Sequence, residues 1–343
     1  MDIKIGKKGI GDGYPCFVIA EIGSNHNNDF NLAIEMIDAA VDSNVDAVKF
    51  QAFKASEHYS KYTPGFEYLD NTDTHELIKS LEINREWHSD LKDYAEKKDV
   101  IFFSSPCDSD AIHSLSKLNV ELYKVASFDL TDDRLISEIA SLKKPLILST
   151  GLANWMDIQI AIDTAKKVGN EDIILLQCTS LYPAPVNLAN LKSMQSMRSA
   201  FGTLVGYSDH TQGDHIPLAA ASMGACVIEK HFTIDRKLPG PDHSFAMEPD
   251  EMLSMMKKLR EIESSIGDGE KNGPRKEELE MYEKGRRSIH AKVDINEGQE
   301  IKDDMISIKR PGLGIHPSQR QQIIGRKSKR LIKADEWITW EMV

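Results

Sequence analysis

Eight short apolar runs between residues 16 and 232 constrain the fold of this chain more than any other sequence feature. They are rich in β-branched and aromatic residues, and their apolar character is continuous rather than alternating. Such runs are typical of parallel strands that are covered on both faces. The predicted strands cover residues 16–21, 46–51, 99–105, 121–127, 145–151, 172–180, 203–210 and 225–232.

Helical patterns lie between most of these runs. Apolar residues recur at helical spacing over residues 30–45. A second pattern covers 161–168, and Gly169 follows it as a candidate C-cap. A third covers 249–266, begins with proline and aspartate, and is closed by Gly267.

Eight strand–helix alternations in about 270 residues predict an α/β fold, a (β/α)8 TIM barrel. A doubly wound open sheet is the alternative, but it usually carries a glycine-rich turn after its first strand. Here the glycines of residues 9–13 precede the first predicted strand. We expect them to form a plain loop.

A second domain is predicted at the C-terminal end. After Gly269 the sequence becomes charged and poor in apolar residues, as in a linker with a short solvated helix. Short β-type runs broken by glycine-containing turns follow. We therefore predict a barrel domain at 1–280, which includes the linker, and a small β-rich domain at 281–343. That domain is near the lower size limit for a stable core, so it should dock on the barrel or on another chain.

The longest gap between predicted strands contains residues 54–80, which we expect to form a loop. In a barrel this loop would lie over the C-terminal mouth, where lids usually lie. A surface excursion without function is the other interpretation.

Composition excludes several classes of protein. The formal net charge is −12, from 42 Lys+Arg and 54 Asp+Glu, which argues against a nucleic-acid partner. No apolar run reaches the roughly 18 residues needed to span a bilayer, and no signal-peptide core is visible, so no membrane partner is expected. The four cysteines are far apart, which argues against a clustered zinc site. We expect a cytoplasmic protein.

Polar residues concentrate at the ends of the eight runs. In a parallel barrel these ends converge on one mouth. The residues are Glu21, Lys49, Gln51, Ser104, Ser105, Lys124, Ser127, Ser149, Thr150, Thr179, Ser180, Ser208, Asp209, His210, Glu229, Lys230 and His231.

Two lysines and several hydroxyl groups in this set predict an anion pocket. Lys49 and Lys124 would supply charge, and Ser105, Ser127 and Ser149 would supply directed donors for a phosphate or carboxylate.

The two histidines at adjacent strand ends predict a metal site. His210 and His231 could share a divalent metal through neutral imidazoles and leave positions open for water and a substrate oxygen. His215 lacks the spacing of a ligand, and we expect it to be structural or exposed. Glu21 could orient water or act as a base, or it could form an ion pair with a lysine.

Several strand-end motifs together resemble the sialic acid synthase family, the N-acetylneuraminate synthases and their relatives. They are AEIGSNHN, VKFQAF, FSSPCD, YKVAS, LSTG, CTSLYPAP, GYSDHT, IEKHFT and LPGPDHSFAMEP. The tail motifs RRSIHAKVDINEGQEI and KRPGLGIHP are similar to the antifreeze-like SAF domain of that family. The resemblance therefore covers nearly the whole chain.

The resemblance implies an enzyme that condenses phosphoenolpyruvate with an N-acetylated amino sugar, giving a nonulosonic acid and phosphate. It implies a barrel dimer in which the SAF domain is swapped onto the partner's site, and it implies Mn²⁺ or Mg²⁺ bound by His210 and His231. Phosphoenolpyruvate would be held by Lys49, Ser105, Lys124, Ser127, Ser149 and Ser208, and His231 would also touch its carboxylate.

The same resemblance implies roles at the sugar. Glu21 would be the acid/base or water-orienting carboxylate. The sugar would contact Gln51, Tyr182 and Asp242, and Arg310 would reach its N-acetyl group across the dimer. Ser180, near phosphoenolpyruvate, and Asp129, near the sugar, depart from the residues common in the family.

Those departures leave the product open. N-acetylmannosamine or a 2,4-diacetamido relative could be the acceptor, and the legionaminic, pseudaminic and spore-coat polysaccharide branches remain alternatives. An aldolase with a Schiff-base lysine at Lys49, Lys124 or Lys230 is a separate alternative. A catalytically silent sugar-binding homologue is the last.

Overall fold

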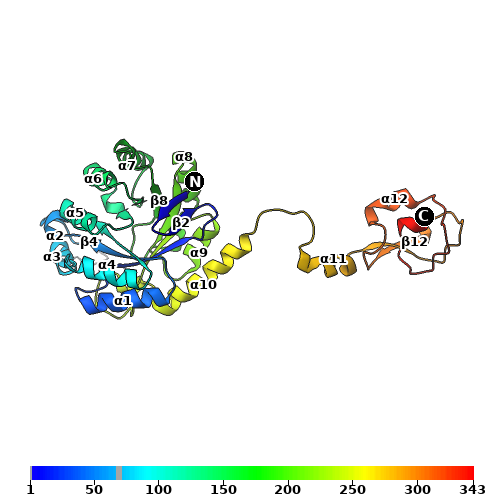
Figure 1. Cartoon of the computed structure of the whole chain (residues 1–343), viewed down its shortest axis with the longest axis horizontal. Coiled ribbons are helices and arrows are strands. Elements are labelled where there is room, and N and C mark those ends of the chain that lie inside the picture. Colours follow the sequence, from blue (N-terminus) through cyan, green and yellow to red (C-terminus); the bar gives the residue numbers. More distant parts are fainter. Residues whose placement is uncertain (1, 67–71) are drawn as a thin grey trace. The chain divides into compact units, whose positions relative to one another are not determined.

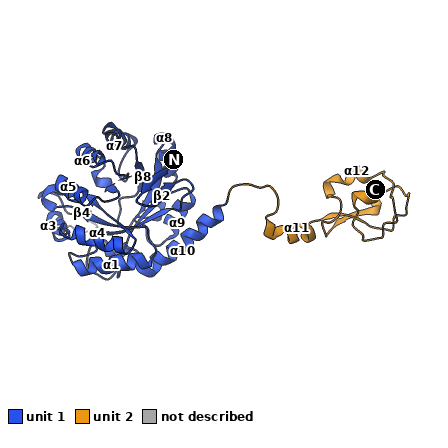
Figure 2. Cartoon of the chain, viewed as in Figure 1, with its two compact units in different colours: residues 1–267 blue, residues 268–343 orange. Residues whose placement is uncertain are grey.

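The structure is a computed structural model that describes residues 2–66 and 72–343. The chain divides into two compact units, Met1–Gly267 and Asp268–Val343 (Figure 2). Within the described residues, no helix combines the length and the apolar character needed to cross a membrane.

Unit 1 is built on eight parallel strands surrounded by helices, which confirms the predicted barrel (Figure 1). Hydrogen bonds join the strands in the order β5-β4-β3-β10-β9-β8-β7-β6, and β5 and β6 at the two ends also contact each other. The strands are β3 (Phe17–Gly23), β4 (Ala47–Ala52), β5 (Ile101–Pro106), β6 (Tyr123–Val125), β7 (Leu146–Ser149), β8 (Ile173–Cys178), β9 (Leu204–Asp209) and β10 (Val227–His231).

The helices of unit 1 lie between these strands and begin at recognisable caps. Asp29, Asp108 and Asp132 each accept hydrogen bonds from the backbone of the helix that they open. The helices are α1 (Phe30–Asp42), α2 (Ala55–His58), α3 (Thr74–Ser80), α4 (Trp87–Lys97), α5 (Ser109–Lys117), α6 (Asp133–Ser141), α7 (Trp155–Lys167), α8 (Lys192–Phe201), α9 (His215–Ser222) and α10 (Pro249–Ile266).

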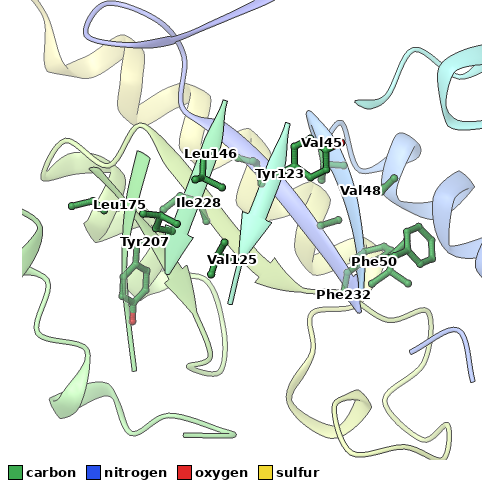
Figure 3. Close-up of a cluster of buried hydrophobic side chains, with 14 of the residues drawn as sticks. Val45, Val48, Phe50, Tyr123, Val125, Leu146, Leu175, Tyr207, Ile228 and Phe232 are labelled. Atoms are coloured by element: carbon green, nitrogen blue, oxygen red, sulfur yellow. The ribbon is translucent and has the colours of Figure 1, made fainter. Parts of the chain in front are cut away.

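Alternation along the strands divides the apolar core into two parts. Val18, Ala20 and Ile22 of β3 belong to the larger part, in which strands pack against helices; Figure 3 shows other members of it. Phe17 and Ile19 belong to a second cluster at the N-terminal end of the barrel interior. Because side chains alternate between faces, each strand can be apolar toward the helices and polar toward the mouth.

An N-terminal hairpin completes the second cluster. It consists of β1 (Asp2–Ile5) and β2 (Lys8–Gly11), which pair antiparallel. Ile3, Ile5 and Ile10 are buried among residues of the barrel interior. The expectation of a plain loop at the glycines of 9–13 is therefore wrong, since residues 9–11 form an edge of this hairpin.

The segment 54–80 is also more ordered than expected. It includes α2 and α3, although residues 67–71 of the predicted loop lie outside the described residues. Asp73 caps α3 by accepting a hydrogen bond from Glu76. The helices α2 and α3 therefore form part of the segment that we expected to be a loop.

Unit 2 has its own core. It contains α11 (Leu279–Gly285), β11 (Ser288–Ala291), β12 (Ile306–Lys309) and α12 (Arg320–Ile323), with β11 and β12 paired antiparallel. Ile289, Ile295 and Ile332 belong to a cluster of buried apolar residues within this unit. The predicted domain boundary after residue 280 falls inside α11, and it stays a prediction.

Candidate active site

The barrel interior changes from apolar to polar along each strand. On β3, Ile19 is followed on the same face by Glu21, and on β10, Val227 is followed by Glu229 and His231. The parallel register aligns Glu21 with Lys49 and with His231, and Gln51 with Ser105. These side chains therefore meet at the C-terminal mouth, in a cavity of about 730 Å³.

The cavity gathers every residue of unit 1 that was predicted to act in the condensation reaction. The other polar strand-end residues, Ser104, Thr150, Thr179, Asp209 and Lys230, do not line it. Arg310 lies in unit 2, where it is exposed. The residues that line the cavity include Glu21, Lys49, Gln51, Ser105, Lys124, Ser127, Asp129, Ser149, Ser180, Tyr182, Ser208, His210, His231 and Asp242. The segment 54–80 contributes to the same cavity through residues such as His58, Phe66 and Ile78.

Lys49 lies at the centre of a buried charge network. Its Nζ is 2.8 Å from Glu21 Oε2, 3.8 Å from Glu229 Oε1 and 3.2 Å from Ser105 Oγ. Gln51 Nε2 donates to Glu21 Oε1 over 2.7 Å. Burial opposes the charge of Lys49, but Glu21 and Glu229 outweigh it and raise the pKa of the lysine.

Lys124 belongs to the same network. Its Nζ is 3.7 Å from Glu229 Oε1 and donates to the backbone oxygen of Val125 over 3.1 Å. Burial lowers the pKa of Lys124, although the attraction of Glu229 opposes this shift. Glu229 thus bridges two lysines, and its displacement would free Lys124 to bind another anion, whereas Lys49 would keep Glu21 as a partner.

The two central carboxylates differ in their protonation tendencies. Burial raises the pKa of Glu21 above its usual range despite the nearby charge of Lys49. Burial also opposes ionisation of Glu229, but Lys124 and Lys49 outweigh it and lower the pKa of Glu229. Two carboxyl groups whose environments separate their pKa values are suited to different chemical roles.

Glu229 is the main residue that had no predicted role. Its position among the polar strand ends was visible in the sequence, but so was that of its neighbour Lys230. The alternation of a strand separates them: His231 and Glu229 line the cavity, whereas Lys230 does not. Instead, Lys230 Nζ lies 2.6 Å from Asp209 Oδ2, and both residues are buried.

The two histidines lie beside each other in the cavity. Their ring centroids are 5.3 Å apart, and Tyr182 lies 4.3 Å from the ring of His210. His210 Nδ1 is 2.8 Å from the backbone oxygen of Thr179, which leaves its Nε2 for a ligand role. His231 Nδ1 is 3.6 Å from Asp242 Oδ2.

The chemistry of this pair fits a divalent metal. Burial lowers the pKa of His231 well below its usual range, so its imidazole is neutral. Burial also opposes the charge of His210, but Cys178 and the backbone oxygen of Thr179 outweigh it and raise the pKa of that histidine. His231 Nδ1 is also buried without a hydrogen-bond partner in the described structure. Burial raises the pKa of Asp242 to about 6, as expected for a carboxyl group without a close cation. A metal ion would supply the missing partner for these groups.

A second polar group lies on another wall of the cavity. It consists of His58, Cys107 and Asp129, whose potential ligand atoms all lie within 4.8 Å of one another. Asp129 was predicted to lie near the sugar, whereas His58 and Cys107 had no predicted role. No sequence spacing signals this group, because its members come from α2, the end of β5 and the turn after β6.

The fold and the site define a class: a (β/α)8 barrel enzyme whose mouth holds paired lysines, carboxylates and histidines around one cavity. The chain belongs to the NeuB family, whose model matches residues 36–271. The SAF domain model matches residues 286–343, within unit 2. These matches confirm the resemblance to the nonulosonic acid synthases.

Individual relatives cover nearly the whole chain. The N,N'-diacetyllegionaminic acid synthase of Legionella pneumophila is 40% identical over 347 residues, which cover 98% of this chain and 97% of the relative. The pseudaminic acid synthase of Helicobacter pylori is 37% identical over 328 residues, covering 94% and 96%. The crystal structure of N-acetylneuraminic acid synthetase from Leptospira borgpetersenii matches with a TM-score of 0.75 and 36% identity, covering 82% of this chain and 94% of that one.

Proposed function

We propose that this chain condenses phosphoenolpyruvate with an N-acetylated amino sugar, giving a sialic-acid-type nonulosonic acid and phosphate. The acceptor would be N-acetylmannosamine or a 2,4-diacetamido relative. The observation that carries this proposal is the arrangement of Lys49 and Lys124, which converge on Glu229 beside the buried Glu21. Family membership supports the same conclusion.

The lysines would bind the anionic substrate. Phosphoenolpyruvate carries a phosphate and a carboxylate, and two buried ammonium groups offer charge to both. Ser105, Ser127, Ser149, Ser180 and Ser208 line the same cavity and would donate hydrogen bonds to the phosphate oxygens. Because these groups are held by the strands, they stabilise developing charge without reorganising.

Glu21 would accept a proton from the attacking water. C3 of phosphoenolpyruvate forms a bond to the aldehyde carbon of the open-chain sugar, and C2 becomes electron-deficient. Water then adds to C2 and gives its proton to Glu21, whose raised pKa suits a group that gains and loses a proton. The former aldehyde oxygen takes up one proton and becomes a hydroxyl group, which balances the proton that water gave to Glu21. The C2–O bond to phosphate breaks, the new C2 hydroxyl gives its proton to the departing phosphate, and the 2-keto acid and hydrogen phosphate leave.

His210 and His231 would hold a divalent metal, Mn²⁺ or Mg²⁺, with Asp242 beside them. When bound, such an ion supplies the Lewis acidity that polarises the aldehyde oxygen of the sugar. Tyr182 packs against His210 and would fix the ring of that ligand. Gln51, Asp129 and Asp242 would orient the sugar from the cavity wall.

Unit 2 would complete the site in a domain-swapped homodimer. Arg310 is exposed in this unit, and we propose that it reaches the N-acetyl group of the sugar in the partner's barrel. The reaction would take place in the cytoplasm, where phosphoenolpyruvate is available, without a nucleic-acid or membrane partner.

The Schiff-base alternative is weakened for one of its three lysines. Lys230 is paired with Asp209 outside the cavity lining, so it is not placed to attack a carbonyl in the cavity. Lys124 remains the strongest candidate for that chemistry, because burial lowers its pKa. Borohydride trapping of a substrate adduct, with activity that survives chelation, would favour it.

Phosphate release tests the proposed reaction directly. The full chain is incubated with Mn²⁺, phosphoenolpyruvate and one sugar at a time: N-acetylmannosamine, 2,4-diacetamido-2,4,6-trideoxymannose, the altrose isomer or none. Sugar-dependent release is expected, and phosphate released in ¹⁸O-water should remain unlabelled, because the C2–O bond and not the P–O bond breaks. If folded, metal-loaded protein that binds phosphoenolpyruvate releases no phosphate with any sugar, a silent homologue becomes the better interpretation.

A further inference from the structure

We propose that His58, Cys107 and Asp129 form a binding site for a soft divalent metal such as Zn²⁺, separate from the pair formed by His210 and His231. Among the residues that the structure describes, this is the group of histidine, cysteine and carboxylate side chains whose ligand atoms approach closely enough to share an ion. The metal site depends on this geometry alone, whereas its effect on activity rests on the proposed condensation reaction.

The three side chains lie close enough to one another for their ligand atoms to share an ion. His58 Nδ1 is 3.8 Å from Asp129 Oδ1, and Cys107 Sγ is 3.8 Å from Asp129 Oδ2. The Cys107 thiol is within range of an S–H···O hydrogen bond to Asp129, whereas His58 is too far away for a direct N–H···O hydrogen bond of about 2.7–3.2 Å. A tetrahedral ion with bonds of about 2.0–2.3 Å separates its ligand atoms by about 3.3–3.8 Å, so small side-chain movements would bring these three ligand atoms, which lie within 4.8 Å of one another, to that spacing.

The donor set is chemically selective. One imidazole, one thiolate and one carboxylate suit Zn²⁺, whereas Mg²⁺ prefers oxygen ligands. The side chain of Asp129 is mostly but not fully buried, and burial raises its pKa although His58 and Lys124 oppose this shift. A divalent ion would add positive charge beside this carboxyl group.

The surroundings hold these ligands in place. The His58 ring stacks on Phe53 at a centroid distance of 6.5 Å and meets Tyr59 edge-on at 4.9 Å. Asp129 belongs to the 3-10 turn η2 (Ser127–Asp129), whose backbone is closed by a hydrogen bond from Asp129 to Ala126. Such packing orients a ligand before the metal arrives.

The site opens into the substrate cavity. All three residues line it, so a fourth coordination position would face the space that we assign to the sugar. Binding would release the proton of Cys107, whose pKa burial holds well above the usual range, to solvent as the metal–thiolate bond forms. Occupation by Zn²⁺ should therefore exclude the acceptor sugar and inhibit the enzyme.

Cobalt substitution provides a direct test. The purified full chain, stripped of metal, is titrated with Co²⁺ alone, and an intense near-ultraviolet thiolate-to-cobalt absorption band is expected. Cys107→Ser should abolish this band. Cys178→Ser is the matched control, because Cys178 is the other cavity cysteine and lies 3.8 Å from His210 Nδ1. Thermal unfolding of each variant verifies that it is folded.

His210→Ala separates the two metal sites. This variant should keep the thiolate band, since His58, Cys107 and Asp129 lie elsewhere in the cavity. In Mn²⁺-supported assays, the Zn²⁺ concentration that halves activity should rise at least about tenfold in Cys107→Ser, as for loss of one metal ligand. A band that is absent from the unmodified protein, or that persists in Cys107→Ser and disappears in Cys178→Ser, would overturn the proposal. Failure of the condensation reaction would leave the spectroscopic result unchanged.

Discussion

Glu21 Oε2 lies 2.8 Å from Lys49 Nζ inside the barrel, and almost none of either side chain is exposed to solvent. The adjacent strands β3 and β4 align these two residues directly. Because Glu229 also faces Lys49, the loss of one carboxylate leaves the lysine with a second one. The role of Glu21 can therefore be tested without leaving an unpaired buried cation.

Replacement of Glu21 by Gln should lower turnover far more than it weakens substrate binding. The amide can still accept from Gln51, but it cannot take a proton from water. We expect kcat to fall by about 10²-fold or more, the usual contribution of a general acid or base, while the Kd of phosphoenolpyruvate changes little. Calorimetry and phosphate release measure the two quantities. Unchanged turnover would remove Glu21 from the mechanism.

Loss of a histidine from the proposed metal pair should abolish metal-dependent activity. His210→Ala removes one of two neighbouring imidazoles, and ligand loss of this kind is expected to weaken Mn²⁺ binding by at least about tenfold. Electron paramagnetic resonance of free Mn²⁺ measures that affinity independently of turnover. His215→Ala, at the exposed start of α9, is the matched control. Full activity of His210→Ala in the presence of a chelator would refute the assignment.

The pair of Lys230 and Asp209 should contribute to stability rather than to chemistry. Lys230→Met leaves the Asp209 carboxylate buried without its 2.6 Å partner, which should lower the free energy of unfolding by about 3–5 kcal/mol. The double variant Lys230→Met/Asp209→Asn removes both charges and should recover part of that loss. Urea unfolding measures all three proteins. A Lys230→Met protein of normal stability but no activity would instead support a catalytic lysine.

His88 should make the fold sensitive to acid. It is completely buried, neither ring nitrogen has a hydrogen-bond partner in the described structure, and burial lowers its pKa to about 4. The unfolded chain binds a proton near pH ~6.5, whereas the folded chain does so only near pH ~4. The contribution of His88 to the free energy of unfolding is therefore fully present above pH ~6.5. It is lost as the pH falls toward ~4, by up to about 3 kcal/mol.

In the variant His88→Leu, unfolding between pH ~6.5 and pH ~4 should take up about one proton fewer than in the unmodified protein, so the free energy of unfolding should depend less steeply on pH. The slope of unfolding free energy against pH, from urea titrations, is the measured quantity. His113→Leu replaces an exposed histidine and serves as the control. An equal slope in the unmodified protein and in His88→Leu would contradict the prediction.

Arg310 should act in trans if the homodimer is domain-swapped. Arg310→Ala should raise the KM of the sugar and leave that of phosphoenolpyruvate nearly unchanged. Mixing it with Glu21→Gln under conditions that allow subunit exchange should restore activity. In the mixed dimer, one site combines the intact Glu21 of one chain with the intact Arg310 of the other. Exchange without any recovery would show that Arg310 does not complete a partner's site.

The sequence by itself determined the strands and the end of the barrel at which the polar side chains gather. Continuous apolar runs form parallel strands because they are buried on both faces, and polar residues at their ends must then meet at one mouth. The observed strands confirm all eight predicted runs, with shifts of a few residues at their ends. Glu21, Lys49 and Lys124 could be placed in one cavity for this reason.

Only the tertiary structure decided which side chains touch. Glu229 and Lys230 are neighbours in sequence, yet Glu229 bridges Lys49 and Lys124 whereas Lys230 pairs with Asp209 outside the cavity lining. The group formed by His58, Cys107 and Asp129 joins segments up to 71 residues apart, as their numbering in the sequence shows. Contacts of that kind depend on the register between strands and on the path of the connecting segments, which local sequence patterns do not encode.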